Sequence, residues 1–145
     1  MRSRSVLGIA MAVGVVVGGC AAPAAAAAKA VNATVTEFKI AADAAKVAAG
    51  DVTFTITNKG ATTHEFVIVK TDLAPTALPK GGDGGVAEGG PLTAVDEVED
   101  IEPGKTKTLT VKVEPGKYAY FCNLAGHYVG GMSGGFEVVA STASK

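Results

Sequence analysis

Apolar and polar residues alternate along much of the chain after residue 30, which is the period of a β-strand with one buried face. The alternation is clearest over 52–56 and 109–113, where Val, Phe, Ile or Leu recur at every second position. Residues 66–69 are a continuous apolar run, as expected for a strand that is buried on both faces. Weaker patterns predict further strands, which begin near residues 31, 117 and 136.

Turn residues separate these segments, as in Asn-Lys-Gly at 58–60 and Glu-Pro-Gly at 114–116. A change of phase between residues 36 and 40 predicts a bulge. The Ala-rich segment 41–49 ends at a glycine and predicts one short helix. Many short strands with turns between them predict an all-β fold, a Greek-key β-sandwich or barrel. A metal-free immunoglobulin-like module is the alternative.

The predicted folded unit is one domain over residues 31–140, followed by a short tail, 141–145. Within it, residues 71–94 are rich in Gly and Pro, with six glycines between 81 and 90. This composition is typical of a loop insert, and it favours a mobile insert over a binding loop. Five acidic residues then fall between 96 and 102. They fit a solvated edge strand, or a docking patch for a basic partner.

The first 19 residues have the features of a signal peptide, because two arginines precede an apolar run of only twelve residues, 6–17. The run ends in Val-Gly-Gly-Cys20, which resembles the lipobox of bacterial lipoproteins. That resemblance implies cleavage before Cys20, a lipid on its sulfur and an Ala-rich tether over 20–30. We therefore expect a membrane-anchored lipoprotein that faces the periplasm or the cell exterior. The alternative is later cleavage, which would release a soluble secreted or periplasmic protein.

Charge adds one exclusion. Without the two leader arginines, 11 lysines stand against 14 acidic residues, a net charge of −3. This balance excludes the basic surface that nucleic-acid binding requires. We expect a monomer.

Within the predicted domain, the chain has one Cys, two His and one Met, namely Cys122, His64, His127 and Met132. A single Cys cannot form a disulfide within an exported domain, whereas a metal bond would explain its presence. One thiolate, two imidazoles and a weak axial thioether are the ligand set of a mononuclear blue-copper site. Four residues separate Cys122 from His127, and four separate His127 from Met132, so one glycine-rich loop could surround an ion.

The segment Cys-Asn-Leu-Ala-Gly-His-Tyr-Val-Gly-Gly-Met at 122–132 resembles the ligand loop of cupredoxins, the small blue-copper proteins. The likeness extends to Phe-x-Ile at 38–40, Gly-Asp-Val-Thr-Phe at 50–54, the approach 58–64, and Pro-Gly-Lys-Tyr at 115–118. It implies one copper ion with three trigonal ligands, His64, Cys122 and His127, and with Met132 as the axial ligand.

The same resemblance implies that the edge of His127 is exposed and passes electrons, with an apolar rim of Leu124, Tyr128 and Val129. It also implies that the Tyr118 hydroxyl fixes a strand corner. The chain departs from the family at Glu65, where many members have Asn or Ser, and at Ala125, where close relatives have Pro.

These observations predict an electron carrier that serves unidentified redox partner proteins, and not an enzyme. Copper enzymes need further histidine clusters, which two histidines cannot supply. A copper chaperone or storage protein is the alternative, although such proteins usually expose several Met or His ligands. A structural zinc site is a further option, but zinc gains little from Met.

Overall fold

The computed structural model describes residue 27 and residues 29–141. The predicted signal peptide, Cys20, most of the tether and the last four residues of the tail lie outside the described residues. In the part that is described, no helix has the length and apolar character needed to cross a membrane.

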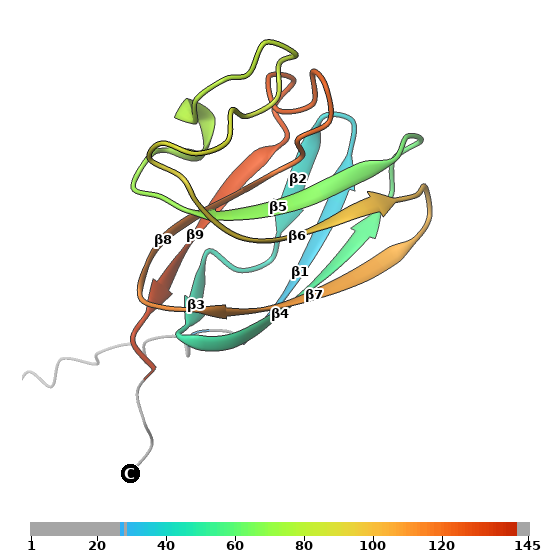
Figure 1. The fold of residues 1–145 in the computed structure, drawn as a ribbon. Helices are drawn as coiled ribbons and strands as arrows, with labels where there is room; N and C mark the ends of the chain where they lie inside the picture. The colour runs from blue at the N-terminus through green and yellow to red at the C-terminus, as the bar shows by residue number, and fades with distance from the viewer. Residues whose placement is uncertain (1–26, 28, 142–145) are drawn as a thin grey trace, which may run out of the picture.

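Two sheets pack face to face (Figure 1). The first has the order β2-β1-β4-β7, and the second has the order β3-β9-β8-β5-β6. The strands of the first sheet are β1 (Ala30–Thr36), β2 (Lys39–Ala42), β4 (Gly50–Asn58) and β7 (Thr106–Val113). Those of the second are β3 (Lys46–Ala48), β5 (His64–Lys70), β6 (Thr93–Ile101), β8 (Gly116–Phe121) and β9 (Ser133–Val139). The predicted all-β, Greek-key β-sandwich in a single domain is confirmed.

The strongest sequence patterns form the central pairings. β4 and β7 are antiparallel neighbours, and Phe54 lies opposite Leu109 on the face that points into the sandwich. β5, which contains the apolar run 66–69, lies between β6 and β8 in the second sheet. Alternation therefore predicted the half-buried strands, and the continuous run predicted the central one.

Two local predictions were wrong. Segment 41–49 contains no helix, because its residues complete β2 and then form β3, which pairs in parallel with β9. Pairing to a neighbouring strand here outweighs the helix propensity of alanine. The phase change at 36–40 is not a bulge, because β1 and β2 are separate antiparallel strands with Thr36 opposite Lys39.

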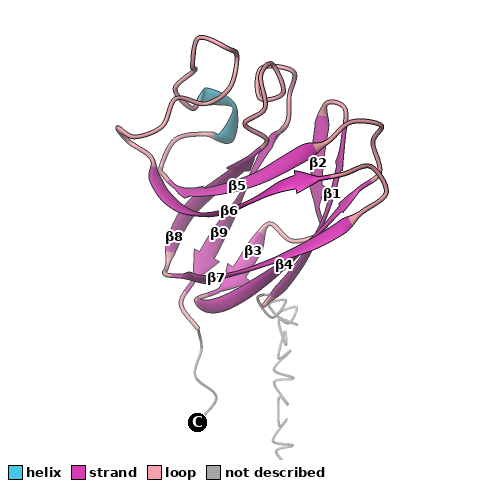
Figure 2. Cartoon of the chain, turned by 45° about the vertical axis from the view of Figure 1, so that its right-hand side comes forward, coloured by secondary structure: helices cyan, strands magenta, loops and turns pink. Residues whose placement is uncertain are grey.

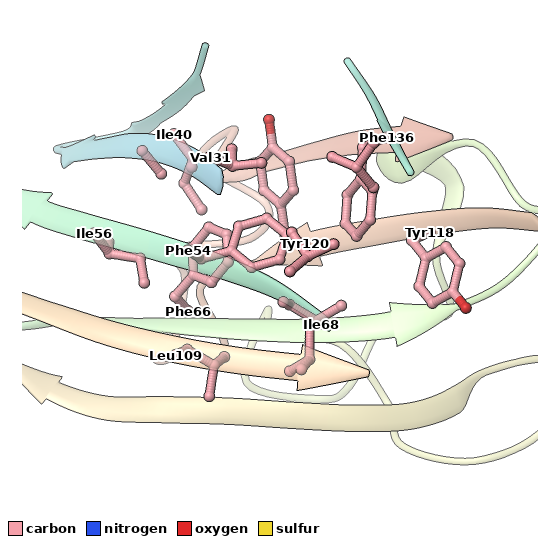
Figure 3. Close-up of a cluster of buried hydrophobic side chains, with 14 of the residues drawn as sticks. Val31, Ile40, Phe54, Ile56, Phe66, Ile68, Leu109, Tyr118, Tyr120 and Phe136 are labelled. Atoms are coloured by element: carbon pink, nitrogen blue, oxygen red, sulfur yellow. The ribbon is translucent and has the colours of Figure 1, made fainter. Parts of the chain in front are cut away.

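Aromatic rings fill the space between the sheets (Figure 3). Phe54 from the first sheet lies 5.7 Å from Phe66 and 5.4 Å from Phe136, both of the second sheet, between ring centroids. Tyr120 stacks on Phe66 at 5.2 Å. Cys122 and Met132 belong to the same buried cluster, so the predicted ligand loop joins the core directly.

The Gly/Pro-rich segment forms a smaller core of its own, so the prediction of a mobile insert was wrong. It contains a short 3-10 helix, η1 (Pro75–Ala77), and its Leu78, Val86 and Leu92 are buried. They pack in a second cluster with residues of β5, β8 and the ligand loop, namely Val69, Ala119, Phe121 and Tyr128. These three apolar side chains hold the glycine-rich segment against the second sheet. Figure 2 shows the segment, with its short helix in cyan, at the upper end of the sandwich.

The acidic run lies on β6, which is the edge strand of the second sheet. Its carboxylates at 96, 97, 99 and 100 are exposed, while Ile101 is buried. The prediction of a solvated edge strand is confirmed, and the charges leave that edge unsuitable for pairing with another strand.

Candidate metal centre

His64 is the first residue of β5, and its side chain is completely buried. Its Nε2 lies 3.2 Å from Oε1 of Glu37, which directly follows β1. A carboxylate can only accept a hydrogen bond, so Nε2 is the nitrogen that donates to Glu37, and Nδ1 is the nitrogen left to face a metal. That Nδ1 faces Cys122 and His127.

Cys122 directly follows β8 and is also completely buried. Its backbone N–H donates to the carbonyl of Met132 at 3.1 Å, and its Sγ accepts from the backbone N–H of Glu65 at 3.3 Å. Burial raises the pKa of the Cys122 thiol, while the N–H groups of Glu65 and Leu124 oppose that rise. The sulfur therefore favours the protonated form unless a cation replaces the proton.

Three donor atoms from three separate positions converge here. Nδ1 of His127 lies 3.3 Å from both Nδ1 of His64 and Sγ of Cys122, and the remaining edge, Sγ to Nδ1 of His64, is 4.0 Å. For a trigonal first-row metal, bonds of about 2.0 Å to nitrogen and 2.3 Å to sulfur give edges of about 3.5–3.7 Å. The triangle thus has the size that such an ion requires.

The loop after β8 holds its own shape by backbone hydrogen bonds. The N–H of His127 donates to the Leu124 carbonyl at 2.9 Å, and the N–H of Met132 donates to the His127 carbonyl at 3.1 Å. His127 is only half-buried. Burial and then the neighbouring His64 lower the pKa of His127, which favours the neutral ring that a metal binds.

Met132 lies at the base of this loop with its side chain completely buried. Its backbone bonds to both Cys122 and His127 place it beside the triangle. The burial of Met132 does not by itself indicate a metal, because its side chain also packs in the main core cluster.

The glycines of the loop and of the start of β9 serve two different purposes. Gly126 and Gly131 have φ of 77° and 117°, values that side chains rarely adopt. Gly130 and Gly134 have ordinary angles, but a Cβ at Gly130 would lie 2.7 Å from the Phe38 ring, and one at Gly134 would meet the Tyr120 ring. Some of these glycines therefore allow the loop to turn, and others allow close packing.

The predicted apolar rim is partly wrong. Val129 is 52% exposed and Leu124 is half-buried, so both remain candidates for a surface contact. Tyr128 is only 4% exposed, because its hydroxyl bonds to the backbone of the insert. Phe38, in the turn between β1 and β2, is 52% exposed and lies edge-on to His127 with centroids 5.6 Å apart. A large apolar residue in a turn is the signal that could have identified it.

The insert supports the ligand loop through several hydrogen bonds. The Tyr128 hydroxyl accepts from the N–H of Leu78 at 2.9 Å and donates to the Pro75 carbonyl at 3.0 Å. The N–H of Gly126 donates to the Asp83 carbonyl at 3.0 Å. Both segments lie at the same end of the sandwich as the turn between β1 and β2 (Figure 1).

Two polar residues near His64 were missed by sequence reasoning. Asn58 is completely buried, and its amide donates to the carbonyls of Thr62 and Ile101, each at 2.7 Å. Glu37 binds the same approach segment. Its own backbone N–H and the Thr62 hydroxyl are the main groups that hold the pKa of Glu37 at about 2. Glu65, where the family pattern has Asn or Ser, still links the two ligand segments through its backbone N–H.

At the opposite end of β8, the Tyr118 hydroxyl donates to the Glu114 carbonyl at 2.9 Å and accepts from the Glu114 N–H at 3.1 Å. The prediction that this hydroxyl fixes a strand corner is confirmed.

Comparison with known proteins gives the same class as the fold and the donor set. A family model described as a cupredoxin-like domain matches residues 9–132. A search among curated protein sequences found no match. The class of protein is thus a β-sandwich with a mononuclear metal site, and the chain belongs to the cupredoxin-like family.

Solved structures agree. The dithionite-reduced auracyanin of Roseiflexus castenholzii is 27% identical, with a TM-score of 0.57 over 78% of this chain and 98% of that one. Auracyanin B is 22% identical, with a TM-score of 0.59 over 84% and 96%. A methionine-to-glutamine variant of rusticyanin is 18% identical, with a TM-score of 0.57 over 78% and 80%. The last two likenesses show the fold alone.

Cupredoxins bind one copper ion and in general carry electrons rather than catalyse reactions. The donor set of this chain fits that ion, since the buried thiol and two imidazole Nδ1 atoms lie within 4.8 Å of one another. Copper is therefore the cofactor of this protein.

Proposed function

We propose that this chain is a type 1 copper protein that carries single electrons at the outer face of a bacterial membrane. His64, Cys122 and His127 would be the trigonal ligands, and Met132 would be the weak axial one. The convergence of one buried thiol with two imidazole nitrogens is the observation that carries the proposal.

Copper would supply a one-electron couple, and the protein would supply a site that suits both oxidation states. Thiolate and imidazole bind Cu⁺ and Cu²⁺ alike. The donors of His64 and Cys122 are held in place, because both side chains are completely buried: His64 donates a hydrogen bond to Glu37, and Cys122 accepts one from the N–H of Glu65. When the coordination of the metal hardly changes on reduction, little reorganisation opposes electron transfer.

Electrons would enter and leave at His127, which is the only half-buried residue among the four proposed ligands. Phe38 lies edge-on to its ring, and Leu124 and Val129 belong to the same loop. Together these three residues would form the contact surface for redox partner proteins. An apolar surface of this kind suits a brief encounter between two monomers, because it needs no matched charges.

Attachment to the membrane would come from a lipid on Cys20. The short apolar run and the lipobox-like ending support this assignment. Expression with a labelled fatty acid tests it: the label should enter the wild-type protein and be absent from Cys20→Ala, which should be found in the soluble fraction. Labelling of both proteins, or of neither, would contradict the anchor.

A redox titration tests the carrier role against the alternative of copper storage or delivery. One equivalent of copper should be reduced and reoxidised reversibly in a single one-electron step, and excess chelator should remove it slowly. Rapid loss of copper to the chelator with no reversible step would favour the chaperone or storage role.

A further inference from the structure

Four hydrogen-bond donors meet one oxygen atom of Glu37. Its Oε1 lies 2.9 Å from the N–H of Ala61, 2.8 Å from both the N–H and the hydroxyl of Thr62, and 3.2 Å from Nε2 of His64. Glu37 follows β1 of the first sheet, whereas His64 opens β5 of the second. One carboxylate therefore ties the segment before His64, and the ring of His64 itself, to the opposite sheet.

The protein reserves space for this carboxylate. A Cβ on Gly60 would lie 2.5 Å from Oε1 and 2.7 Å from Oε2 of Glu37. Any side chain at position 60 would displace the carboxylate from its four donors. The buried amide of Asn58 holds Gly60 in place through a 2.8 Å bond to its N–H.

The partner of His64 is an acidic side chain, and its four donors stabilise the charged form of that side chain. A neutral carbonyl in the same place would also keep the proton on Nε2 and leave Nδ1 for the metal. A carboxylate does this and also makes Nδ1 of the ring a more basic metal ligand. Its negative charge favours the more positive of two metal oxidation states. The Glu37 side chain is 29% exposed, so water screens part of this charge.

We infer that Glu37 is a positioning residue of the copper site that also lowers its reduction potential. It holds His64 with Nδ1 toward the metal, and its charge stabilises Cu²⁺ relative to Cu⁺. This inference rests on the proposed function.

The first test uses the metal-free protein. ¹⁵N NMR of the imidazoles should show His64 with its proton on Nε2 in the wild type and in Glu37→Gln, because the glutamine oxygen can still accept. Glu37→Ala should give a mixture of tautomers. A wild-type His64 protonated on Nδ1 would overturn the positioning role, whatever metal the protein binds.

The second test is the potential of the copper-loaded protein. Glu37→Gln removes the charge but keeps an acceptor, so the visible band should persist while the preference for Cu²⁺ over Cu⁺ falls about tenfold. For one electron that ratio is about 59 mV, and the potential should rise. Glu114→Gln is the matched control, because Glu114 lies at the far end of β8 from Cys122 and its side chain is 85% exposed.

Gly60→Ala is a second route to the same result. It leaves Glu37 intact but forces its carboxylate away, so the potential should again rise, by less than in Glu37→Gln. A potential in Glu37→Gln and Gly60→Ala that matches the Glu114→Gln control would overturn the charge effect while leaving the carrier role intact. A wild-type protein without a blue spectrum would instead contradict the proposed function, and the NMR result would still decide the positioning role.

Discussion

The two segments that bring ligands to the site are held in different ways. His64 is a single residue at the start of a strand, completely buried, with its ring bonded to the carboxylate of Glu37. The loop 122–132 carries the other three proposed ligands and is held by neutral bonds: its own backbone turns, and contacts with the insert at Asp83, Leu78 and Pro75.

This difference separates two properties of the centre. A charged partner acts on the electron density of its ligand, so changes near His64 should move the potential. Neutral bonds fix positions without adding charge, so changes beneath the loop should affect stability and rigidity. The insert, although rich in glycine, therefore belongs to the support of the site.

The largest expected effect comes from removing the Cys122 thiolate, which belongs to the loop and faces His64. Cys122→Ser should lose the intense visible band of the copper-loaded protein and keep only weak absorption, because the sulfur-to-copper charge transfer is gone. Circular dichroism should still show the β-fold, since serine is close in size. A blue Cys122→Ser protein would contradict the ligand assignment.

Shortening a buried side chain of the insert should lower the stability of the protein substantially if the insert supports the loop. Leu78 is 2% exposed, so Leu78→Ala should lower the free energy of unfolding by about 2–5 kcal/mol. Leu73→Ala is the matched control, because Leu73 is 36% exposed and its loss should change stability by no more than about 0.5 kcal/mol. Equal urea midpoints for the two variants would mean that the insert is not part of the folded core.

The axial position should affect the potential without removing the colour. Met132→Gln replaces a soft thioether with a harder amide oxygen, which favours Cu²⁺. We expect a coloured protein whose potential falls by about 59 mV or more, a tenfold change in the ratio of affinities. An unchanged potential, measured by redox titration, would mean that Met132 is core filler only.

Two tyrosines sharpen the comparison further. Tyr128→Phe and Tyr118→Phe each remove a hydroxyl that bonds to backbone groups, so each should cost about 1–3 kcal/mol in urea unfolding. Only Tyr128 lies in the ligand loop, and only its variant should change the EPR spectrum of the copper-loaded protein. The same spectral change in both would show that the effect is general loosening.

The smallest structural change should be at the exposed rim. Val129→Lys should leave the spectrum unchanged but slow electron self-exchange about tenfold, because two copies would bring like charges together near His127. NMR line broadening in a mixture of both oxidation states measures this rate. Leu73→Lys adds the same charge elsewhere, and an equal slowing there would exclude the rim as the site of exchange.

Much of the fold followed from short-range pattern. Alternation around Phe54 and Leu109 gave the half-buried strands, since the period of two is a property of each strand alone. Segment 41–49 was mispredicted because alanine has little preference that a neighbouring strand cannot override. The insert was mispredicted because composition does not reveal where Leu78, Val86 and Leu92 pack.

The candidate site likewise contains residues that the sequence reveals and residues that only the fold reveals. His64, Cys122, His127 and Met132 stood out because each residue type is rare in this chain and has distinctive chemistry. Glu37 did not stand out, because it is one of 14 acidic residues and its role depends on a contact 27 positions away. Tyr128 was assigned to the surface because the family resemblance gives no account of an insert that buries it.

The visible and EPR spectra of the wild-type protein, loaded with one equivalent of Cu²⁺ and then reduced, test the central claim most directly. We predict an intense visible band and a narrow copper hyperfine splitting, both lost on reduction and recovered on reoxidation. A weakly coloured protein with the wide splitting of ordinary Cu²⁺ would contradict the assignment of a thiolate-bound electron-transfer site.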